Sequence, residues 1–522
     1  MKMIRSENGQ TSMVGQGIVK DMERLDPGAC YRAIQTRDRR FDGRLFVGVT
    51  STGVYCRPIC PARTPKYEHC RFFQTAAAAQ EAGFRACLRC RPEISPELAG
   101  WQGTATTVSR ALSLIAEGFL DQSGAGIDTL ANRLGMGGRQ LRRLFEEHLG
   151  ASPSSVAQTR RVLFAKQLLH ETQLSMTDVA MASGFGSVRR FNDAFRAQYR
   201  RPPSELRQRR LAHDPRLSSP PAITLHVPYQ PPYDWSSMLA YLNARAIEGV
   251  EEVRNGCYRR TVSLEGSDGV VEVANDPVRQ GLTVSIQFPS VRALPVIVLR
   301  IRRMFDVFAD VNRIGTHLSH DPALARLIAQ RPGLRAPGAW DGFELAVRAI
   351  LGQQITVEAA RQLAGKLVRV CTQSSASLPG GSLTCVFPSP SCLAAADLSA
   401  LGMPNSRKKT LKILAEAAKR TPHLFEPVGS VEEAMHRLRA IPGIGEWTAQ
   451  YIALRALRET DAFPATDVGI LRGAMKLDGM ATTAEKLMGR AERWRPWRAY
   501  AAQHLWAAGA APVSKMNGGS HA

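Results

Sequence analysis

The chain has 522 residues, with 68 lysines and arginines against 46 aspartates and glutamates, which gives a formal net charge of +22. At about 100 to 200 residues per domain this length predicts three or four domains, and a hydrophobic fraction of 44% excludes a wholly disordered chain. So large an excess of positive charge favours a polyanion over a small acidic substrate, because neutralised phosphates release their counterions.

No apolar run reaches the roughly 18 residues that a membrane span needs, and residues 1–20 lack the apolar core of a signal peptide. We therefore expect a cytoplasmic protein without a membrane partner. Ten cysteines among 522 residues are too few for a disulfide scaffold. In a reducing compartment, clustered thiols are more often metal ligands.

The residue pattern divides the chain into five segments. Residues 25–95 hold six of the cysteines beside Arg, Gly and Pro, which predicts a small metal-bound α+β domain. Residues 106–210 have helical periodicity with almost no alternation, which predicts an all-α domain. Residues 213–232 are rich in proline and typical of a linker that overlaps the next domain and couples the two halves only loosely. Residues 222–307 predict an α+β layer, and residues 308–510 an all-α domain.

Four cysteines in the first segment form two closely spaced pairs. Three residues separate Cys56 from Cys60, two separate Cys87 from Cys90, and 26 lie between the pairs. Four sulfurs in this order can close the tetrahedral shell of one Zn²⁺. Most closed sites of four cysteines are structural, so the spacing alone favours a zinc that only stabilises the fold.

The residues around these cysteines resemble the metal-binding domain of the Ada adaptive-response proteins. The resemblance rests on GVTSTGVYCRPICPAR at 48–63 and AGFRACLRC at 82–90. It implies that Cys56 is both a zinc ligand and a nucleophile that irreversibly takes a methyl group from a DNA methylphosphotriester, and that Arg63 contacts DNA. Zinc would hold the sulfur as the reactive thiolate. Methylation would make that ligand neutral, reduce the repulsion of phosphate and raise the affinity for DNA.

Two similar helix-turn-helix patterns occupy the second segment, over residues 127–145 and 176–195, each with glycines in its turn. This duplication resembles the DNA-binding domain of AraC-type regulators, which places two recognition helices in successive major grooves. Any single arginine here could simply lie on a solvent-exposed helix face. That alternative does not explain why the helix-turn-helix pattern occurs twice. We expect base or phosphate contacts from Arg139, Gln140, Arg142, Arg143, Ser187, Arg189, Arg190 and Asn192.

Residues 438–454 contain a glycine-rich bend, IPGIGEW, between two predicted helices. Backbone N–H groups around Gly443 and Gly445 would face a DNA phosphate at the start of the second helix, and the bend is also a candidate site for a monovalent cation. Asp467 follows Gly445 by 22 residues. An aspartate in such a position is most often a helix cap, but a hairpin followed by an aspartate resembles the helix-hairpin-helix DNA glycosylases.

Further motifs narrow this resemblance to 3-methyladenine DNA glycosylase II, the AlkA type. They are QPPYDW at 230–235, RPGLR at 331–335, AVRAILGQQ at 346–354 and AERWRPWR at 491–498. Trp447 stands where relatives with lyase activity carry a lysine, and no cysteine follows Cys392 to bind an iron–sulfur cluster. The resemblance therefore implies monofunctional hydrolysis, in which Asp467 stabilises the sugar and orients or deprotonates water.

The same resemblance implies a pocket for a base that has been flipped out of the DNA. Alkylation at purine N3 or N7 leaves the base positively charged, so it favours electron-rich rings. Gln354, with Ile355 beside it, occupies the position of the wedge that fills the vacated stack. By motif position the rings are Trp447, Tyr451, Trp506 and Tyr241, and each of them could equally be a core aromatic.

The sequence thus predicts a multidomain alkylation-response protein. It would join a zinc methyl acceptor and a double helix-turn-helix DNA reader to a glycosylase for bases such as 3-methyladenine and 7-methylguanine. The expected partners are alkylated and promoter double-stranded DNA, and RNA polymerase. The alternative is a non-enzymatic DNA-binding regulator whose glycosylase half is degenerate.

Overall fold

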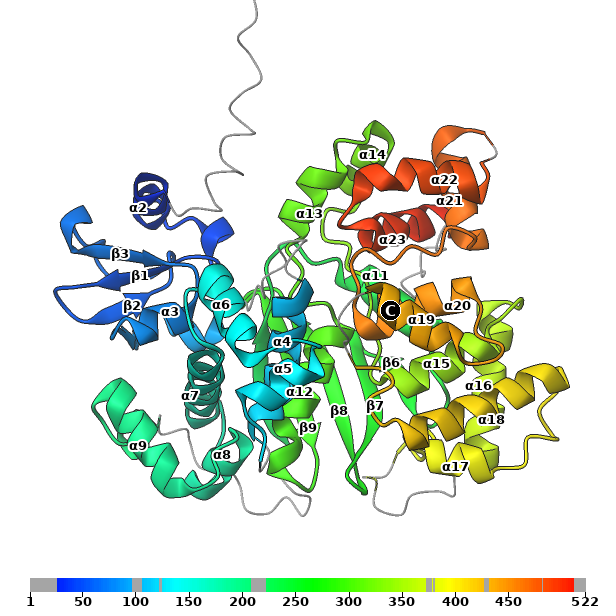
Figure 1. Cartoon of the computed structure of the whole chain (residues 1–522), viewed down its shortest axis with the longest axis horizontal. Coiled ribbons are helices and arrows are strands. Elements are labelled where there is room, and N and C mark those ends of the chain that lie inside the picture. Colours follow the sequence, from blue (N-terminus) through cyan, green and yellow to red (C-terminus); the bar gives the residue numbers. More distant parts are fainter. Residues whose placement is uncertain are drawn as a thin grey trace, which may run out of the picture.

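The chain folds into three parts that follow one another along the sequence (Figure 1). They are a small four-stranded sheet with short helices, a group of helices, and a five-stranded sheet joined to a larger helical region. This arrangement confirms the predicted multidomain class. The computed structural model describes residues 26–95, 106–121, 124–207, 222–371, 378, 381–426, 431–480 and 482–510. None of the helices in these ranges combines the length and the hydrophobicity that crossing a membrane requires.

The first part, which we call the zinc domain, is a four-stranded sheet with short helices. Its elements are α2 (Pro27–Gln35), η1 (Arg39–Phe41), β1 (Phe46–Val49), β2 (Val54–Cys56), η2 (Tyr67–His69), β3 (Cys70–Phe73), α3 (Ala76–Glu81), β4 (Arg85–Ala86) and η3 (Pro92–Ile94). The strands lie in the order β3-β1-β2-β4, and β2 pairs in parallel with β4. Because β2 ends at Cys56 and Cys87 directly follows β4, this pairing brings the two cysteine pairs to one end of the sheet.

The second part consists of two helix-turn-helix units. Its elements are α4 (Thr106–Ala116), η4 (Phe119–Asp121), α5 (Ile127–Arg133), α6 (Gly138–Leu149), α7 (Pro153–Glu171), α8 (Met176–Ala182), α9 (Val188–Tyr199) and α10 (Pro203–Leu206). The turns between α5 and α6 and between α8 and α9 contain Gly135 and Gly184, whose φ angles of 73° and 80° favour glycine. The long helix α7 joins the two units.

The third part begins with a five-stranded antiparallel sheet in the order β5-β9-β8-β7-β6. Its elements are β5 (Ile223–Pro228), α11 (Trp235–Asn243), β6 (Glu251–Arg254), β7 (Cys257–Leu264), β8 (Ser267–Asp276), β9 (Gly281–Gln287), η5 (Val291–Ala293) and α12 (Leu294–Met304). Apolar residues of α12, such as Ile297 and Ile301, share a core with Val271 and Ile286 of the sheet.

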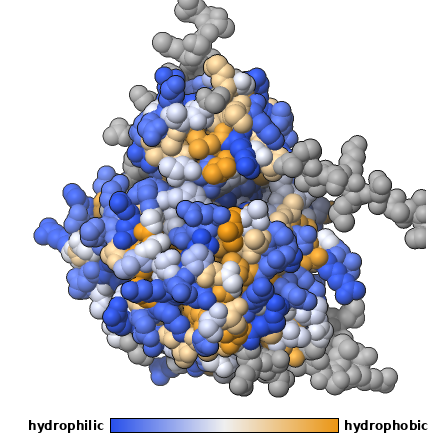
Figure 2. Space-filling model, turned by 90° about the vertical axis from the view of Figure 1, so that its right-hand side faces the viewer, coloured by the Kyte–Doolittle hydropathy of each residue, from blue (hydrophilic) through white to orange (hydrophobic). Residues whose placement is uncertain are grey.

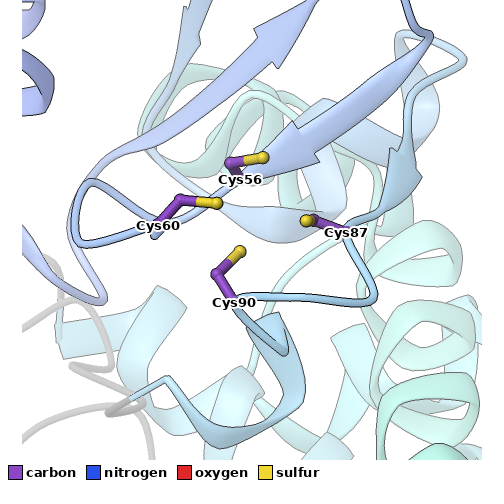
Figure 3. Close-up of side chains that lie close together, drawn as sticks. All are labelled: Cys56, Cys60, Cys87 and Cys90. Carbon is purple, nitrogen blue, oxygen red and sulfur yellow. The ribbon is translucent and has the colours of Figure 1, made fainter. Parts of the chain in front are cut away.

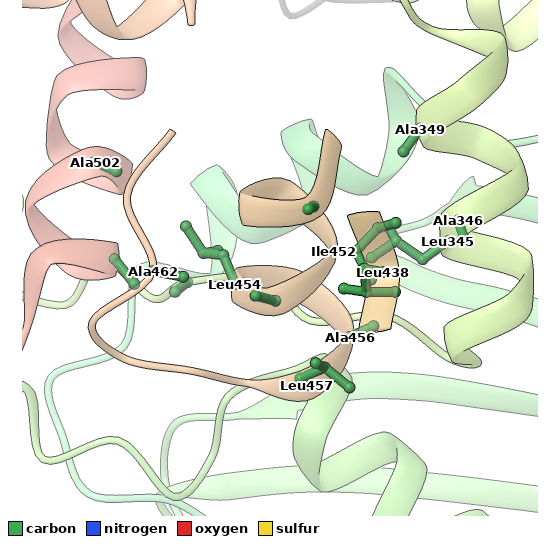
Figure 4. Close-up of a cluster of buried hydrophobic side chains, with 14 of the residues drawn as sticks. Leu345, Ala346, Ala349, Leu438, Ile452, Leu454, Ala456, Leu457, Ala462 and Ala502 are labelled. Carbon is green, nitrogen blue, oxygen red and sulfur yellow. The ribbon is translucent and has the colours of Figure 1, made fainter. Parts of the chain in front are cut away.

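A larger helical region completes the third part. Its elements are α13 (Val311–Leu318), α14 (Pro322–Gln330), α15 (Gly342–Leu351), α16 (Val357–Cys371), α17 (Pro390–Ala395), α18 (Asn405–Arg420), α19 (Val431–Arg439), α20 (Glu446–Ile452), the π-helical turn η6 (Ala453–Leu457), α21 (Val468–Asp478), α22 (Ala484–Ala491), η7 (Glu492–Trp494) and α23 (Arg498–Gly509). Leu345 and Ala346 of α15 pack with Leu438 of α19 and Ile452 of α20 (Figure 4). This core fixes the glycine-rich bend between α19 and α20 relative to the rest of the region.

One face of the third part is hollowed. Figure 2 shows this face, which has a hollow between an upper and a lower group of atoms. In Figure 1 the upper group corresponds to α13, α14 and α21 to α23, and the lower group to α15 to α20. Most residues on this face are hydrophilic, with smaller hydrophobic patches beside the hollow.

The helix α7 is fixed to both of its neighbours. Lys166 of α7 and Glu93 of the zinc domain form an ion pair at 2.7 Å, and both side chains are fully buried. At the end of α7, Glu171 accepts a hydrogen bond at 2.9 Å from the backbone N–H of His226 in β5, and Gln167 donates to the His226 carbonyl at 2.7 Å. One helix therefore holds the zinc domain and the sheet of the third part together.

Further ion pairs join the helix-turn-helix part to the third part. Arg110 of α4 pairs with Glu459 at 2.9 Å, and Arg303 of α12 pairs with Glu117 at 2.6 Å. Residues 213–221 of the predicted linker lie outside the described residues, and its remainder includes β5. The expectation of loosely coupled halves is wrong, because polar side chains that are far from the proline-rich stretch in sequence join the two halves.

A test of this junction is to replace Lys166 with Met. The Glu93 carboxylate then stays buried without its ammonium partner, although Arg91 remains 3.0 Å away. We expect a loss of about 3 kcal/mol in the free energy of unfolding, measured by urea denaturation followed by circular dichroism. Adding Glu93→Gln should recover much of the loss. The control Glu416→Gln breaks an exposed pair with Lys419 and should cost far less, since solvent screens that pair. Equal effects of the two single variants would contradict this role for the buried pair.

Candidate functional site

Asp467 is the N-cap of α21, and it also lies where α20, α21 and α23 meet. Its Oδ1 accepts hydrogen bonds from the backbone N–H groups of Gly469 and Ile470 at 2.8 and 3.1 Å. The indole N–H of Trp506 donates to the same oxygen, and that of Trp447 donates to Oδ2, both at 2.8 Å. Four N–H donors thus converge on one half-buried carboxylate, which suits an ionised, acceptor-only group.

The structure brings the four predicted rings together beside Asp467. The rings of Trp447 and Tyr451 are stacked, with centroids 5.4 Å apart and planes 14° apart. Trp506 meets Tyr451 edge-on, at 6.2 Å and 81°. Tyr241, from α11, lies with its hydroxyl 3.2 Å from that of Tyr451. Side chains from α11, α20 and α23 therefore form one aromatic cluster around the carboxylate.

Arg455, which the sequence analysis missed, lies against three of these rings. Its guanidinium carbon is 4.9 Å from the centroid of Tyr241, 5.7 Å from that of Tyr451 and 4.8 Å from that of Trp506. The side chain is only 2% exposed, and it donates to the side-chain oxygen of Gln503 at 2.9 Å. A fixed positive charge therefore forms the inner wall of the aromatic cluster.

Two guanidiniums also lie close to the tyrosine pair and affect its pKa values. Burial raises the pKa of Tyr451 to about 12, and the neighbouring Tyr241 acts in the same direction. Burial also acts to raise the pKa of Tyr241, but the charges of Arg455 and of Arg245, which lies 4.0 Å from its ring, outweigh burial and lower that pKa. The two hydroxyls share one hydrogen bond, in which either of them can be the donor.

The glycine-rich bend lies between α19 and α20 and is exposed at both predicted glycines. Gly443 has a φ of 89°, and a Cβ at this position would come within 2.0 Å of Thr410 Oγ1, so no other residue fits without rearrangement. Gly445 is the N-cap of α20. Gln353 donates to the Gly443 carbonyl at 3.0 Å and to Thr448 at 3.1 Å, which links the bend to the turn after α15. That turn exposes the two residues predicted as the wedge, Gln354 and Ile355.

The second centre is the group of four cysteines, whose sulfurs point toward one another (Figure 3). The Sγ atoms of Cys56, Cys60, Cys87 and Cys90 all lie within 4.8 Å of one another. A tetrahedral Zn²⁺ with bonds of about 2.3 Å to sulfur has sulfur–sulfur edges of about 3.8 Å, so the size and chemistry of this donor set fit one zinc.

Arg57 contacts the cysteine group through both its side chain and its backbone. Its side chain is buried and donates to Asp42 at 2.7 Å and to the Cys90 carbonyl at 3.1 Å. Its backbone N–H faces Cys90 Sγ at 3.4 Å. A positive charge and an N–H donor beside the cluster offset the negative charge of four thiolates.

The recognition helices present most of their predicted contact residues to solvent. Arg189 lies 4.0 Å from Asp193 on its own helix, and Ser187 is half-buried because it caps α9, accepting from the N–H of Arg190 at 3.2 Å. Asn192 is also half-buried. The remaining predicted residues on these helices are exposed: Arg139, Gln140, Arg142 and Arg143 on α6, and Arg190 on α9.

Four family models match successive stretches of the chain. They are the metal binding domain of Ada over residues 29–93, a helix-turn-helix domain over 130–209, the AlkA N-terminal domain over 224–341, and the HhH-GPD superfamily base excision DNA repair protein over 347–499. A Mycobacterium tuberculosis (strain CDC 1551 / Oshkosh) protein, "Probable bifunctional transcriptional activator/DNA repair enzyme AlkA", is 40% identical over 487 residues, which are 93% of this chain and 97% of that protein. This chain belongs to that bifunctional family.

Other relatives of the family match one half of the chain. "DNA-3-methyladenine glycosylase 2" of Escherichia coli (strain K12) is 39% identical over 281 residues, covering 53% of this chain and 95% of that protein. "Bifunctional transcriptional activator/DNA repair enzyme Ada" of the same strain is 29% identical over 155 residues, covering 30% of this chain and 42% of that protein. Together these matches confirm the fusion that the motifs indicated.

The cysteine group generates a prediction about metal content. Purified protein should contain one zinc per chain by atomic emission spectroscopy, and Cys60→Ala or Cys87→Ala should lose the zinc and unfold the zinc domain, because metal binding and folding are coupled. Cys30→Ala is the control. Cys30 lies in the same core, where burial raises the pKa of its thiol to about 11, so its loss should weaken packing and leave the zinc bound. Zinc retained at full occupancy after Cys87→Ala would rule out a four-sulfur site.

Proposed function

We propose that this chain hydrolyses the N-glycosidic bond of alkylated bases in DNA and also regulates transcription through its DNA-binding half. The observation that supports the enzyme is the Asp467 carboxylate, which four N–H donors hold beside four aromatic rings. The identity with the Escherichia coli glycosylase over 281 residues supports the AlkA type. A regulator with a degenerate glycosylase half, the alternative, has no need for this charge among these rings.

In the proposed reaction, the flipped base enters the aromatic cluster and stacks against Trp447, whose electron-rich face favours the positive charge of an N3- or N7-alkylated purine. The bond between C1′ and the base nitrogen breaks, and its electron pair leaves with the base, which becomes neutral. Asp467 stabilises the positive charge that develops on the sugar. Water adds to C1′, and Asp467 orients the water and accepts its proton.

We further propose that Cys56 takes the methyl group of a DNA methylphosphotriester. Bound zinc would keep cysteine sulfur in the thiolate form. The Cys56 sulfur attacks the methyl carbon, a carbon–sulfur bond forms as the carbon–oxygen bond breaks, and the phosphate oxygen keeps the electron pair. The products are a thioether and an ordinary phosphodiester anion. The position of Cys56 on the wall of a groove lined by arginines supports this role.

The regulatory half would act on promoter DNA. We propose that α6 and α9 enter successive major grooves, and that the neutral thioether at Cys56 strengthens this binding by reducing the repulsion of phosphate. RNA polymerase is the partner that an activator on DNA would recruit. The proposal of a monovalent cation at the bend between α19 and α20 rests on the resemblance alone.

The glycosylase is tested by Asp467→Asn. We expect base release from methylated DNA to fall by at least about 10²–10³-fold, while binding to an abasic-site duplex stays within a few-fold. Free 3-methyladenine is measured by chromatography under single-turnover conditions. The matched control is Asp341→Asn, because Asp341 caps α15 with the same pattern of hydrogen bonds, at 2.9 and 3.1 Å, but lies outside the aromatic cluster.

Three outcomes would contradict the assignment. Base release by Asp467→Asn close to that of the wild type would remove Asp467 from the reaction. Equal losses of activity and thermal stability in both variants would mean that Asp467 acts only as a helix cap. Absence of base release by the wild-type chain would favour the non-enzymatic alternative.

The methyl acceptor is tested by mass spectrometry after incubation with a duplex that carries methylphosphotriesters. We expect a single added methyl group of about 14 Da, on Cys56, since the group is transferred once and not turned over. Cys392→Ala is a suitable control, because Cys392 is exposed and distant in sequence from the four-cysteine group. A methyl group on Cys60, Cys87 or Cys90 instead of Cys56 would refute the assignment of the nucleophile.

A further inference from the structure

A groove of about 450 Å³ lies beside Cys56, and two parts of the chain line it. The zinc domain contributes Cys56, Arg63 and Arg89, among other residues. Tyr199 and Arg201 come from the end of α9, which is the second recognition helix. The wall of the methyl-acceptor groove is therefore shared between the zinc domain and the second helix-turn-helix unit.

The end of α9 is fixed to the zinc domain. Gln198 donates to the Phe84 carbonyl at 3.3 Å, and Tyr199, which is 5% exposed, belongs to the same buried cluster as Phe84 and Ala86. The helix ends at Tyr199, and its C-cap residue, Arg200, has a φ of 55°. The next residue, Arg201, is thereby held at the groove by the residues that precede it.

The groove has an excess of unpaired positive charge. Arg63, Arg89 and Arg201 are all exposed. None of the three forms an ion pair or a side-chain hydrogen bond within the described part of the chain. Like charges around one groove repel each other, and a polyanion in the groove relieves this repulsion. Leu88, which also lines the groove and is 49% exposed, adds an apolar surface suited to a deoxyribose.

The length of α9 connects this groove to the recognition function. The helix has 12 residues, which corresponds to about 18 Å, whereas the major groove of DNA is about 12 Å wide. A helix that places its first turns in the major groove therefore has its last turn over a phosphate strand that borders that groove. The last turn of α9 is the one that ends beside Cys56.

We propose that the groove beside Cys56 holds the sugar–phosphate backbone of the same DNA that α9 reads, and that Arg201 positions this backbone for methyl transfer. This proposal rests on the proposed role of Cys56 as methyl acceptor. Arg201 contacts the phosphate next to the methylated one. It takes no part in the exchange of bonds, in which the methyl carbon passes from phosphate oxygen to sulfur.

The test measures single-turnover transfer from a duplex with one methylphosphotriester to full-length, zinc-loaded protein. We expect Arg201→Ala to lower the second-order rate constant about tenfold, and to reduce the slope of log rate against log salt by about 0.9, the contribution of one phosphate contact. Arg201→Lys, which keeps the charge, should restore most of the rate and the slope. Arg32→Ala removes an exposed arginine of the zinc domain that does not line the groove, and should behave like the wild type.

A second measurement separates positioning from a structural effect. Methyl iodide alkylates thiolates without any DNA, so we expect all four proteins to gain a methyl group from it on Cys56 at equal rates. Slower reaction of Arg201→Ala with methyl iodide would mean that the substitution disturbs the cysteine group, and would overturn the proposal.

The remaining outcomes distinguish this proposal from the one on which it rests. If the wild type gains a methyl group from DNA and Arg201→Ala gains it at the same rate and with the same salt slope, the second helix-turn-helix unit has no part in transfer. If the wild type gains no methyl group from DNA but reacts with methyl iodide, the acceptor role of Cys56 itself is wrong, and this proposal is overturned with it.

Discussion

Buried charge is the constraint on which the arrangement of the three parts depends. Lys166 is fully buried in α7, and the desolvation of an ammonium group costs several kcal/mol unless a carboxylate lies beside it. Glu93 of the zinc domain provides that carboxylate at 2.7 Å. Further along the same helix, Glu171 satisfies the N–H of His226 at the start of the glycosylase sheet. Neither neighbour of α7 can move away without leaving a charge or an N–H group unpaired in the core.

The same constraint shapes the site around Asp467. Arg455 is a buried cation, and the faces of Tyr241, Tyr451 and Trp506 surround it at 4.8 to 5.7 Å. A positively charged base that approaches these three rings also approaches the guanidinium. Among the described residues, Trp447 is the one ring of the four with no guanidinium over its face, and its indole N–H holds Asp467. Of the four rings, Trp447 therefore suits a cationic base best, and under the proposed function it would link base binding to the carboxylate.

Local patterns in the sequence predicted the helices and strands. They did not predict the contacts between segments that are distant in sequence. The cysteine spacing predicted a four-sulfur group, and the pairing of β2 with β4 brings those cysteines together. The two interpretations of Asp467, helix cap and site residue, are both compatible with the structure, because its two oxygens accept four hydrogen bonds. Arg455 lies eight residues after Trp447 and four after Tyr451, a helical spacing that could have placed it on their face. No local pattern relates Arg110 to Glu459, 349 positions away. For the same reason the proline-rich composition of residues 213–232 predicted a loose connection that the ion pairs between the parts exclude.

These ion pairs limit how the two activities can share DNA. The Arg110–Glu459 pair is almost fully buried, with side chains 5% and 13% exposed, so salt screens it far less than a surface pair. Bending at residues 213–232 would have to break it, together with the contacts of α7 on β5. The recognition helices and Asp467 are therefore held in fixed positions relative to each other, so the two DNA-binding surfaces cannot close around one segment by bending at this stretch. A net charge of +22 suits a protein in which both the helix-turn-helix units and the glycosylase region bind DNA.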